Sequence, residues 1–96
     1  MLENIEIGFQ LKHDFKVMST EKNIYMKDLI INEANEILDS GHTVHQFERE
    51  DEYTSLIIDI SPELKDEIKS YCKANGVRIR DFWMECIQQS MRRYDE

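Results

Sequence analysis

The fold is decided by the stretch SLIIDISPELKDEIKSYCKANGVRIRDFWMECIQQSM, residues 55–91. It opens with apolar residues at every second position, Leu56, Ile58 and Ile60. A period of two predicts a half-buried strand, with Ile57 and Asp59 on its open side.

Two helices are predicted after this strand. Ser61 is a good N-cap, and Pro62 suits the first helical position, where its missing N–H costs nothing. Gly76 can adopt the left-handed conformation that ends a helix. The first helix has an apolar face of Leu64, Ile68, Tyr71 and Cys72, and the second has a stripe of Ile79, Phe82, Trp83, Cys86, Ile87 and Tyr94.

The same order of elements is written earlier in the chain. Residues 5–38 slide onto residues 58–91 without a gap, and the apolar positions coincide along the whole unit. Ile5 meets Ile58 and Leu11 meets Leu64, while Asn23 takes the place of Gly76. The second helix of this copy has the stripe Met26, Leu29, Ile30, Ala34, Ile37 and Leu38. The match predicts an internal duplication.

A strand and two helices in some forty residues cannot bury their own apolar faces, so the two copies are expected to pack together. The fold class predicted is mostly α with a short antiparallel β-ribbon, in which two tandem units form an intrachain pseudo-dimer. The units expected are residues 1–39 and 54–96, joined by an acidic linker at 40–53, and together they make one folded domain.

Composition limits the class of protein. The net charge is −8, and residues 33–52 alone contribute −6, from seven acids against Arg49. The N-terminal residues lack the pattern of a signal peptide, and no apolar run is long enough to span a membrane. Cys72 and Cys86 are expected to be reduced, buried thiols in a cytoplasmic protein, although a disulfide between them stays possible.

With this order of strand, N-cap, helix, glycine turn and helix, residues 55–91 resemble the ribbon-helix-helix proteins, the Arc/CopG/MetJ-like regulators. Residues 4–38 look like a degenerate second copy, which makes a tandem single-chain form. The resemblance implies a regulator that binds double-stranded DNA, with the ribbon in the major groove, and it implies no cofactor.

The resemblance also assigns site residues. The outward ribbon positions would read bases: Leu2, Asn4 and Glu6 in the first copy, and Ser55, Ile57 and Asp59 in the second. The starts of the second helices would hold flanking phosphates: Ile24, Tyr25, Met26 and Lys27, and Val77, Arg78, Ile79 and Arg80.

An alternative function follows from the acidity. Two of the six outward positions are carboxylates and two are aliphatic, which suits an acidic inhibitor or antitoxin-like module. The acidic segment 33–52 and the ribbon carboxylates would then face a basic protein partner. The position of residues 33–52 should decide between the two, because acids beside the ribbon would repel DNA and acids away from it would not.

Other patterns carry less information. No nucleophile–base pairing or glycine-rich phosphate loop is present, so an enzyme is not expected. The sequence HTVH, residues 42–45, has a spacing that can hold a metal on a helix, but linker histidines are the default interpretation and no metal site is predicted. Met84 and Ile31 match across the repeat and fall just beside the apolar stripes, so they indicate either a contact surface or a wider buried stripe.

Overall fold

The computed structural model of the protein describes residues 1–41, 43–48 and 52–94. These residues form two strands and four helices, in the order β1 (Leu2–Gly8), α1 (Phe9–Lys22), α2 (Met26–Ser40), β2 (Tyr53–Asp59), α3 (Pro62–Asn75) and α4 (Ile79–Tyr94). The predicted fold class, mostly helical with a short antiparallel sheet, is confirmed. In the described ranges no helix is long and apolar enough to cross a membrane.

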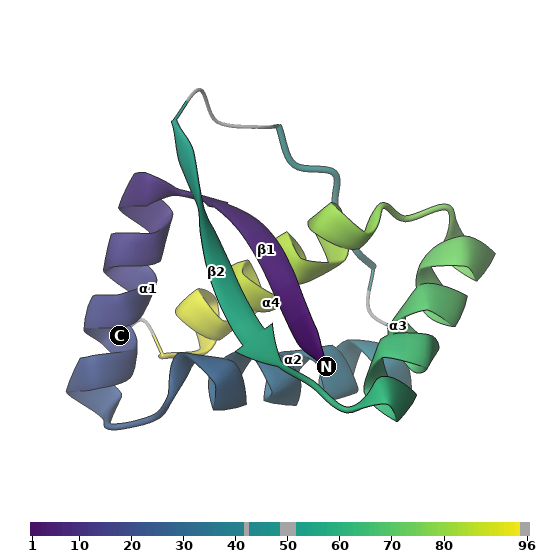
Figure 1. Ribbon diagram of the computed structural model, residues 1–96, viewed down its shortest axis with the longest axis horizontal. Helices are drawn as coiled ribbons and strands as arrows, with labels where there is room; N and C mark the ends of the chain where they lie inside the picture. Colours follow the sequence, from purple (N-terminus) through teal and green to yellow (C-terminus); the bar gives the residue numbers. More distant parts are fainter. Residues whose placement is uncertain (42, 49–51, 95–96) are drawn as a thin grey trace.

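The two strands, 45 residues apart in the sequence at their nearest ends, pair antiparallel as a ribbon over the helices (Figure 1). The predicted alternation holds in both strands. Ile5, Ile7, Leu56 and Ile58 are buried, whereas Ser55, Ile57 and Asp59 are exposed. The ribbon therefore has one face against the helices and one face open to solvent.

Both first helices end in the left-handed conformation. Asn23 has φ 57° and Gly76 has φ 64°, as the sequence predicts for a residue that caps a helix C-terminus. The amides that follow then bond back to the preceding turn, Ile24 to the Ser19 carbonyl at 3.0 Å and Val77 to the Cys72 carbonyl at 2.9 Å. At the other end of α3, the Ser61 hydroxyl accepts from the Leu64 amide, which confirms the predicted N-cap.

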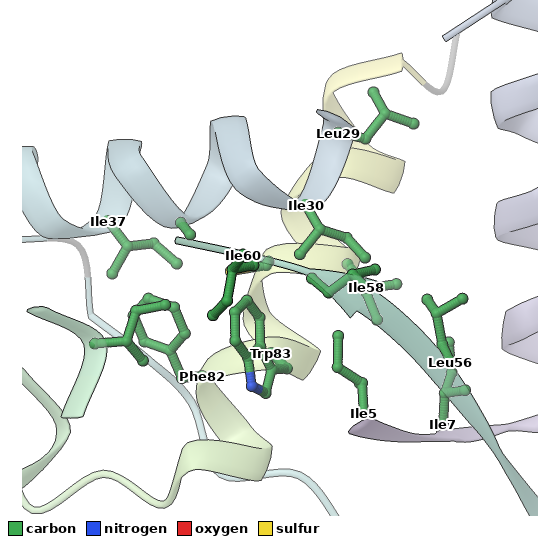
Figure 2. Packing of buried hydrophobic residues seen from close by; sticks show 14 of the residues in the cluster. Ile5, Ile7, Leu29, Ile30, Ile37, Leu56, Ile58, Ile60, Phe82 and Trp83 are labelled. Carbon is green, nitrogen blue, oxygen red and sulfur yellow. The ribbon is translucent and has the colours of Figure 1, made fainter. Parts of the chain in front are cut away.

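The core lies between the ribbon and the pair α2 and α4, which pack against each other. Figure 2 shows Ile5, Ile7, Leu56 and Ile58 of the ribbon converging on side chains from both helices. Trp83, 2% exposed, and Phe82, fully buried, fill the α4 side. One such cluster, shared by all six elements, explains how a short chain buries enough apolar surface to fold.

Burial along α4 differs from the predicted stripe, because Asp81, Met84, Glu85 and Ser90 are buried as well. Ile79 was expected in the stripe, but it is 37% exposed as the first residue of the helix. Met84 is buried and Ile31 is half-buried against the core, so of the two interpretations of this pair the structure favours the wider stripe.

The helices of the two copies have corresponding bounds. Adding 53 to the bounds of α1 gives residues 62–75, which are the bounds of α3. Adding 53 to the start of α2 gives residue 79, where α4 begins. The spacing found in the sequence is therefore also the spacing of the helices.

Candidate functional site

The open face of the ribbon brings together the six predicted reading positions. The cross-strand pairs are Asn4 with Ile57 at the centre, Leu2 with Asp59 on one side and Glu6 with Ser55 on the other. Leu2 is 71% exposed and Ile57 is 60% exposed, whereas Glu6 is half-buried. This face presents apolar, amide, hydroxyl and carboxylate groups together, with no Lys or Arg among the six positions.

One end of this face is marked by Asp59. The N-terminal ammonium group of Met1 donates to the Asp59 carboxylate at 2.6 Å. This bond, more than the nearby charge of Lys27, holds the pKa of Asp59 below its usual value. The carboxylate and Lys27 at the start of α2 thus lie at the same end of the ribbon.

The opposite end has a matching pair of charges. Glu6 and Arg80 line one shallow hollow, together with Ile7, Gly8, Glu48, Tyr53 and Met84. Glu6 corresponds to Asp59 in the repeat, and Arg80 corresponds to Lys27. A cation from the start of a second helix therefore flanks the ribbon at each end.

Two other lysines touch the ribbon, and sequence reasoning did not identify them. Lys12 on α1 donates to the Ser55 carbonyl at 2.8 Å, and Lys65 on α3 pairs with the buried Glu3 at 2.9 Å. A lysine one turn into each first helix was visible in the repeat. The contact of each lysine with a strand could not be predicted from the sequence, because it depends on how the helix crosses the ribbon.

The start of α4 is held by a buried carboxylate, Asp81, which is 2% exposed. Arg78 donates to it through Nε at 2.8 Å and through Nη2 at 3.3 Å. Arg80 lies 3.9 Å from the same carboxylate. Both arginines predicted to hold phosphates are thus paired inside the protein, although the Arg78 side chain stays 61% exposed.

Residues 43–48, called the strap below, run across this end of α4. The Phe47 amide donates to Asp81 at 3.1 Å, and the Phe47 carbonyl accepts from Arg80 at 3.1 Å and more weakly from Arg78 at 3.4 Å. The strap therefore contacts both arginines and the acid that positions them.

A second anchor of the strap is Glu85, one turn further along α4 and fully buried. It accepts from the His45 amide at 2.9 Å, and its Oε1 lies 2.8 Å from His45 Nδ1, within hydrogen-bond distance. Two acids four residues apart in an apolar stripe were the available signal for a partner at this site. Sequence reasoning did not use it.

The equivalent start of α2 has no such cover in the described part of the chain. Tyr25, the N-cap residue, is 81% exposed and makes no side-chain cap. Asp28, which corresponds to Asp81, and Asn32, which corresponds to Glu85, are both exposed. The starts of α2 and α4 therefore share a backbone pattern, but only the start of α4 is contacted by the strap.

Three acids of residues 33–52 lie in two places, the space between α2 and α4 and one end of the ribbon. Glu33 is buried and pairs with Arg93 of α4 at 2.6 Å, a bond that raises the pKa of Arg93. Glu36 lines the same hollow between α2 and α4, where no ribbon residue takes part. Glu48 instead lies beside Glu6 at one end of the ribbon. Among the described acids of this segment, Glu33 and Glu36 therefore lie away from the ribbon, and Glu48 lies at one end of it.

The cysteines and histidines form no visible metal centre. Cys72 and Cys86 are free thiols, and burial raises the pKa of both. Within residues 1–41, 43–48 and 52–94 no group of three His, Cys, Asp or Glu residues could hold a metal ion. His42 lies outside the described residues, so the HTVH spacing is seen only at its His45 end.

Comparisons of the chain with family models, with curated protein sequences and with solved structures found no match. Any functional assignment therefore depends on the ribbon face and its flanks.

Proposed function

We propose that the chain is a small DNA-binding regulator, built as a tandem ribbon-helix-helix pseudo-dimer whose ribbon enters the major groove. The observation that carries the proposal is the strand register. Asn4 and Ile57 occupy the same position in the two copies and pair with each other at the centre of the ribbon. A twofold between the copies requires such a central pair, and the flanking pairs, Leu2 with Asp59 and Ser55 with Glu6, are then equivalent too.

The open face offers groups that can distinguish bases. The Asn4 amide can make a bidentate contact with adenine, and the Ser55 hydroxyl can bond to any base edge. A carboxylate such as Glu6 can accept from the amino group of cytosine, and Ile57 can contact a thymine methyl group. Readout by such a face favours sites with few phosphate contacts and depends on shape as well as charge.

The flanking cations would contact the DNA backbone. Lys27 and Arg80 lie at opposite ends of the ribbon, each at the start of a second helix, where backbone N–H groups also favour an anion. Such contacts set register and affinity but carry no sequence information. The net charge of −8 makes this affinity modest, and each phosphate contact makes it fall further as salt is added.

The proposal is tested by selecting duplexes from a random pool at low salt and titrating the selected sequence. Lys27→Ala should weaken binding on all sequences alike and lower the salt slope by about 1, because one phosphate contact is lost. Lys22→Ala, in the last turn of α1, is the matched control and should leave the titration unchanged. Asn4→Ala should instead change which sequences are selected. Failure to retain any duplex at low salt would exclude DNA binding.

A second candidate function is an acidic module that binds a basic protein, as an inhibitor or antitoxin does. The observation that favours it is the ribbon face itself, where Leu2 and Ile57 are well exposed and no outward position is basic. An apolar centre rimmed by carboxylates is a common form of protein-binding surface.

Ile57→Lys separates the two functions because the expected effects have opposite signs. A cation at the centre of the ribbon should strengthen DNA binding about tenfold at low salt, since it adds a phosphate or base contact. The same change places a charge in the centre of an apolar contact, so it should abolish binding to a protein partner.

A further inference from the structure

The strap occupies the same arginines that the DNA backbone would need at one end of the ribbon. The Phe47 carbonyl takes N–H donors from Arg78 and Arg80, and Glu48 lies in the hollow that Arg80 and Glu6 line. A phosphate oxygen at Arg80 would have to replace the carbonyl, and the Glu48 carboxylate would repel it.

The arginines stay positioned when the strap leaves. Asp81 fixes Arg78 through Nε, and it lies close to Arg80, independently of any strap atom. When the strap leaves, the N–H groups that the Phe47 carbonyl had accepted from become free on both guanidinium groups and can donate to a new acceptor. Glu85 also keeps partners on its own helix, since Gln89 donates to it at 3.1 Å and Arg92 lies 3.9 Å away.

Within the described residues, few contacts hold the strap. Its anchors are the amides of His45 and Phe47, the Phe47 carbonyl, the His45 ring and the half-buried side chains of Val44 and Phe47. Local openings of segments with so few buried contacts have low free energies compared with global unfolding. The strap can therefore be displaced while the core stays folded.

We propose that residues 43–48 are an autoinhibitory strap, which occupies the arginine flank of the ribbon and must be displaced from Arg78 and Arg80 before that flank can hold a DNA phosphate. This inference rests on the proposed DNA-binding function. It follows that the free protein has one open flank, at Lys27, and one closed flank, at Arg80. Because the strap must first be displaced, the apparent affinity equals the affinity of the open state multiplied by the fraction of molecules in which the strap is open.

The first test uses the unaltered protein. Amide hydrogen exchange should show the His45 and Phe47 amides protected in the free protein, because they donate to buried carboxylates. Both should lose protection in the complex with the selected duplex. Amides that remain protected in the complex would overturn the inference.

The second test uses a loosened strap, Val44→Ser with His45→Ala. It should bind the selected duplex about three- to tenfold more tightly than the unaltered protein, because the open state becomes more populated. His13→Ala, an exposed histidine on α1, is the control and should change nothing. Adding Arg80→Ala to the loosened strap should remove the gain.

The outcomes separate the two proposals. Equal affinity of the loosened and unaltered proteins, with both folded by circular dichroism, would overturn the strap and leave DNA binding in place. No binding by either protein would overturn both. Binding by the loosened protein alone would support both.

Discussion

The starts of α2 and α4 have the same backbone pattern, but the strap covers only the start of α4. Each follows a left-handed cap residue, and each makes the same first backbone bonds, from Leu29 to the Tyr25 carbonyl and from Phe82 to the Arg78 carbonyl, both at 3.1 Å. Yet Asp28 is exposed, whereas Asp81 is 2% exposed beneath the strap. The difference teaches that two units can share the same order of elements and the same backbone bonds, while a single connecting segment can lie on only one of them.

The presence of the strap at only one helix start changes the surroundings of the cations there. At α2 the N-cap residue Tyr25 makes no side-chain cap, and Lys27 is exposed, with the Asp59 carboxylate as a nearby opposite charge. At α4 two arginines are paired with an acid and with a carbonyl of the strap. One copy therefore presents its cation to solvent, and the other keeps its cations in an internal network.

The largest expected effect comes from truncating the two equivalent aspartates. Asp81→Ala should destabilise the protein by about 2–3 kcal/mol, because the Phe47 amide and the Arg78 guanidinium lose a buried acceptor. Asp28→Ala should cost no more than about 0.5 kcal/mol, since an exposed acid in the first turn contributes only through the helix dipole. Urea unfolding of both variants measures the difference. Equal costs would mean that Asp81 is not the anchor described here.

An intermediate effect is expected at the starts of the first helices. Ser61 caps α3 with its hydroxyl, whereas Gly8 at the start of α1 has no side chain to do so. Ser61→Ala should therefore lower the free energy of unfolding by about 1 kcal/mol. Ser70→Ala, on the exposed side of α3, is the control and should be neutral or slightly stabilising because alanine favours helix. A loss as large for Ser70→Ala would contradict the capping role.

The smallest effect is expected at the left-handed cap residues. Asn23→Gly should stabilise the protein by a few tenths of a kcal/mol, roughly the advantage of glycine over asparagine in this conformation. Gly76→Asn should cost a similar amount, and there is open space around its Cα to hold the new side chain. Thermal unfolding of the reciprocal pair should give shifts of opposite sign. Shifts of the same sign would show that the two turns are not equivalent.

Local patterns determined much of the molecule. The period of two in Leu56, Ile58 and Ile60 set the ribbon faces, and Ser61, Asn23 and Gly76 set three helix ends. These features depend on residues within a few positions of each other, so they can be identified without tertiary information. The six outward positions of the candidate site follow from the same alternation.

The strap could not be identified in this way. The bonds from Phe47 to Asp81 and from His45 to Glu85 join residues 34 and 40 positions apart. The place of Asp81 and Glu85 within the apolar stripe of α4 indicates that they need partners, but it does not say which residues supply them. Their burial follows only when the linker crosses α4, since a carboxylate out of water needs partners from elsewhere in the chain.

The sequence by itself thus determined the doubled order of strand and two helices and the polarity of the ribbon faces, because short-range periodicity and capping residues encode them. The tertiary structure decided the strand register and the coverage of one helix start and not the other. Both depend on where distant segments meet, and that is set by the packing of the shared core.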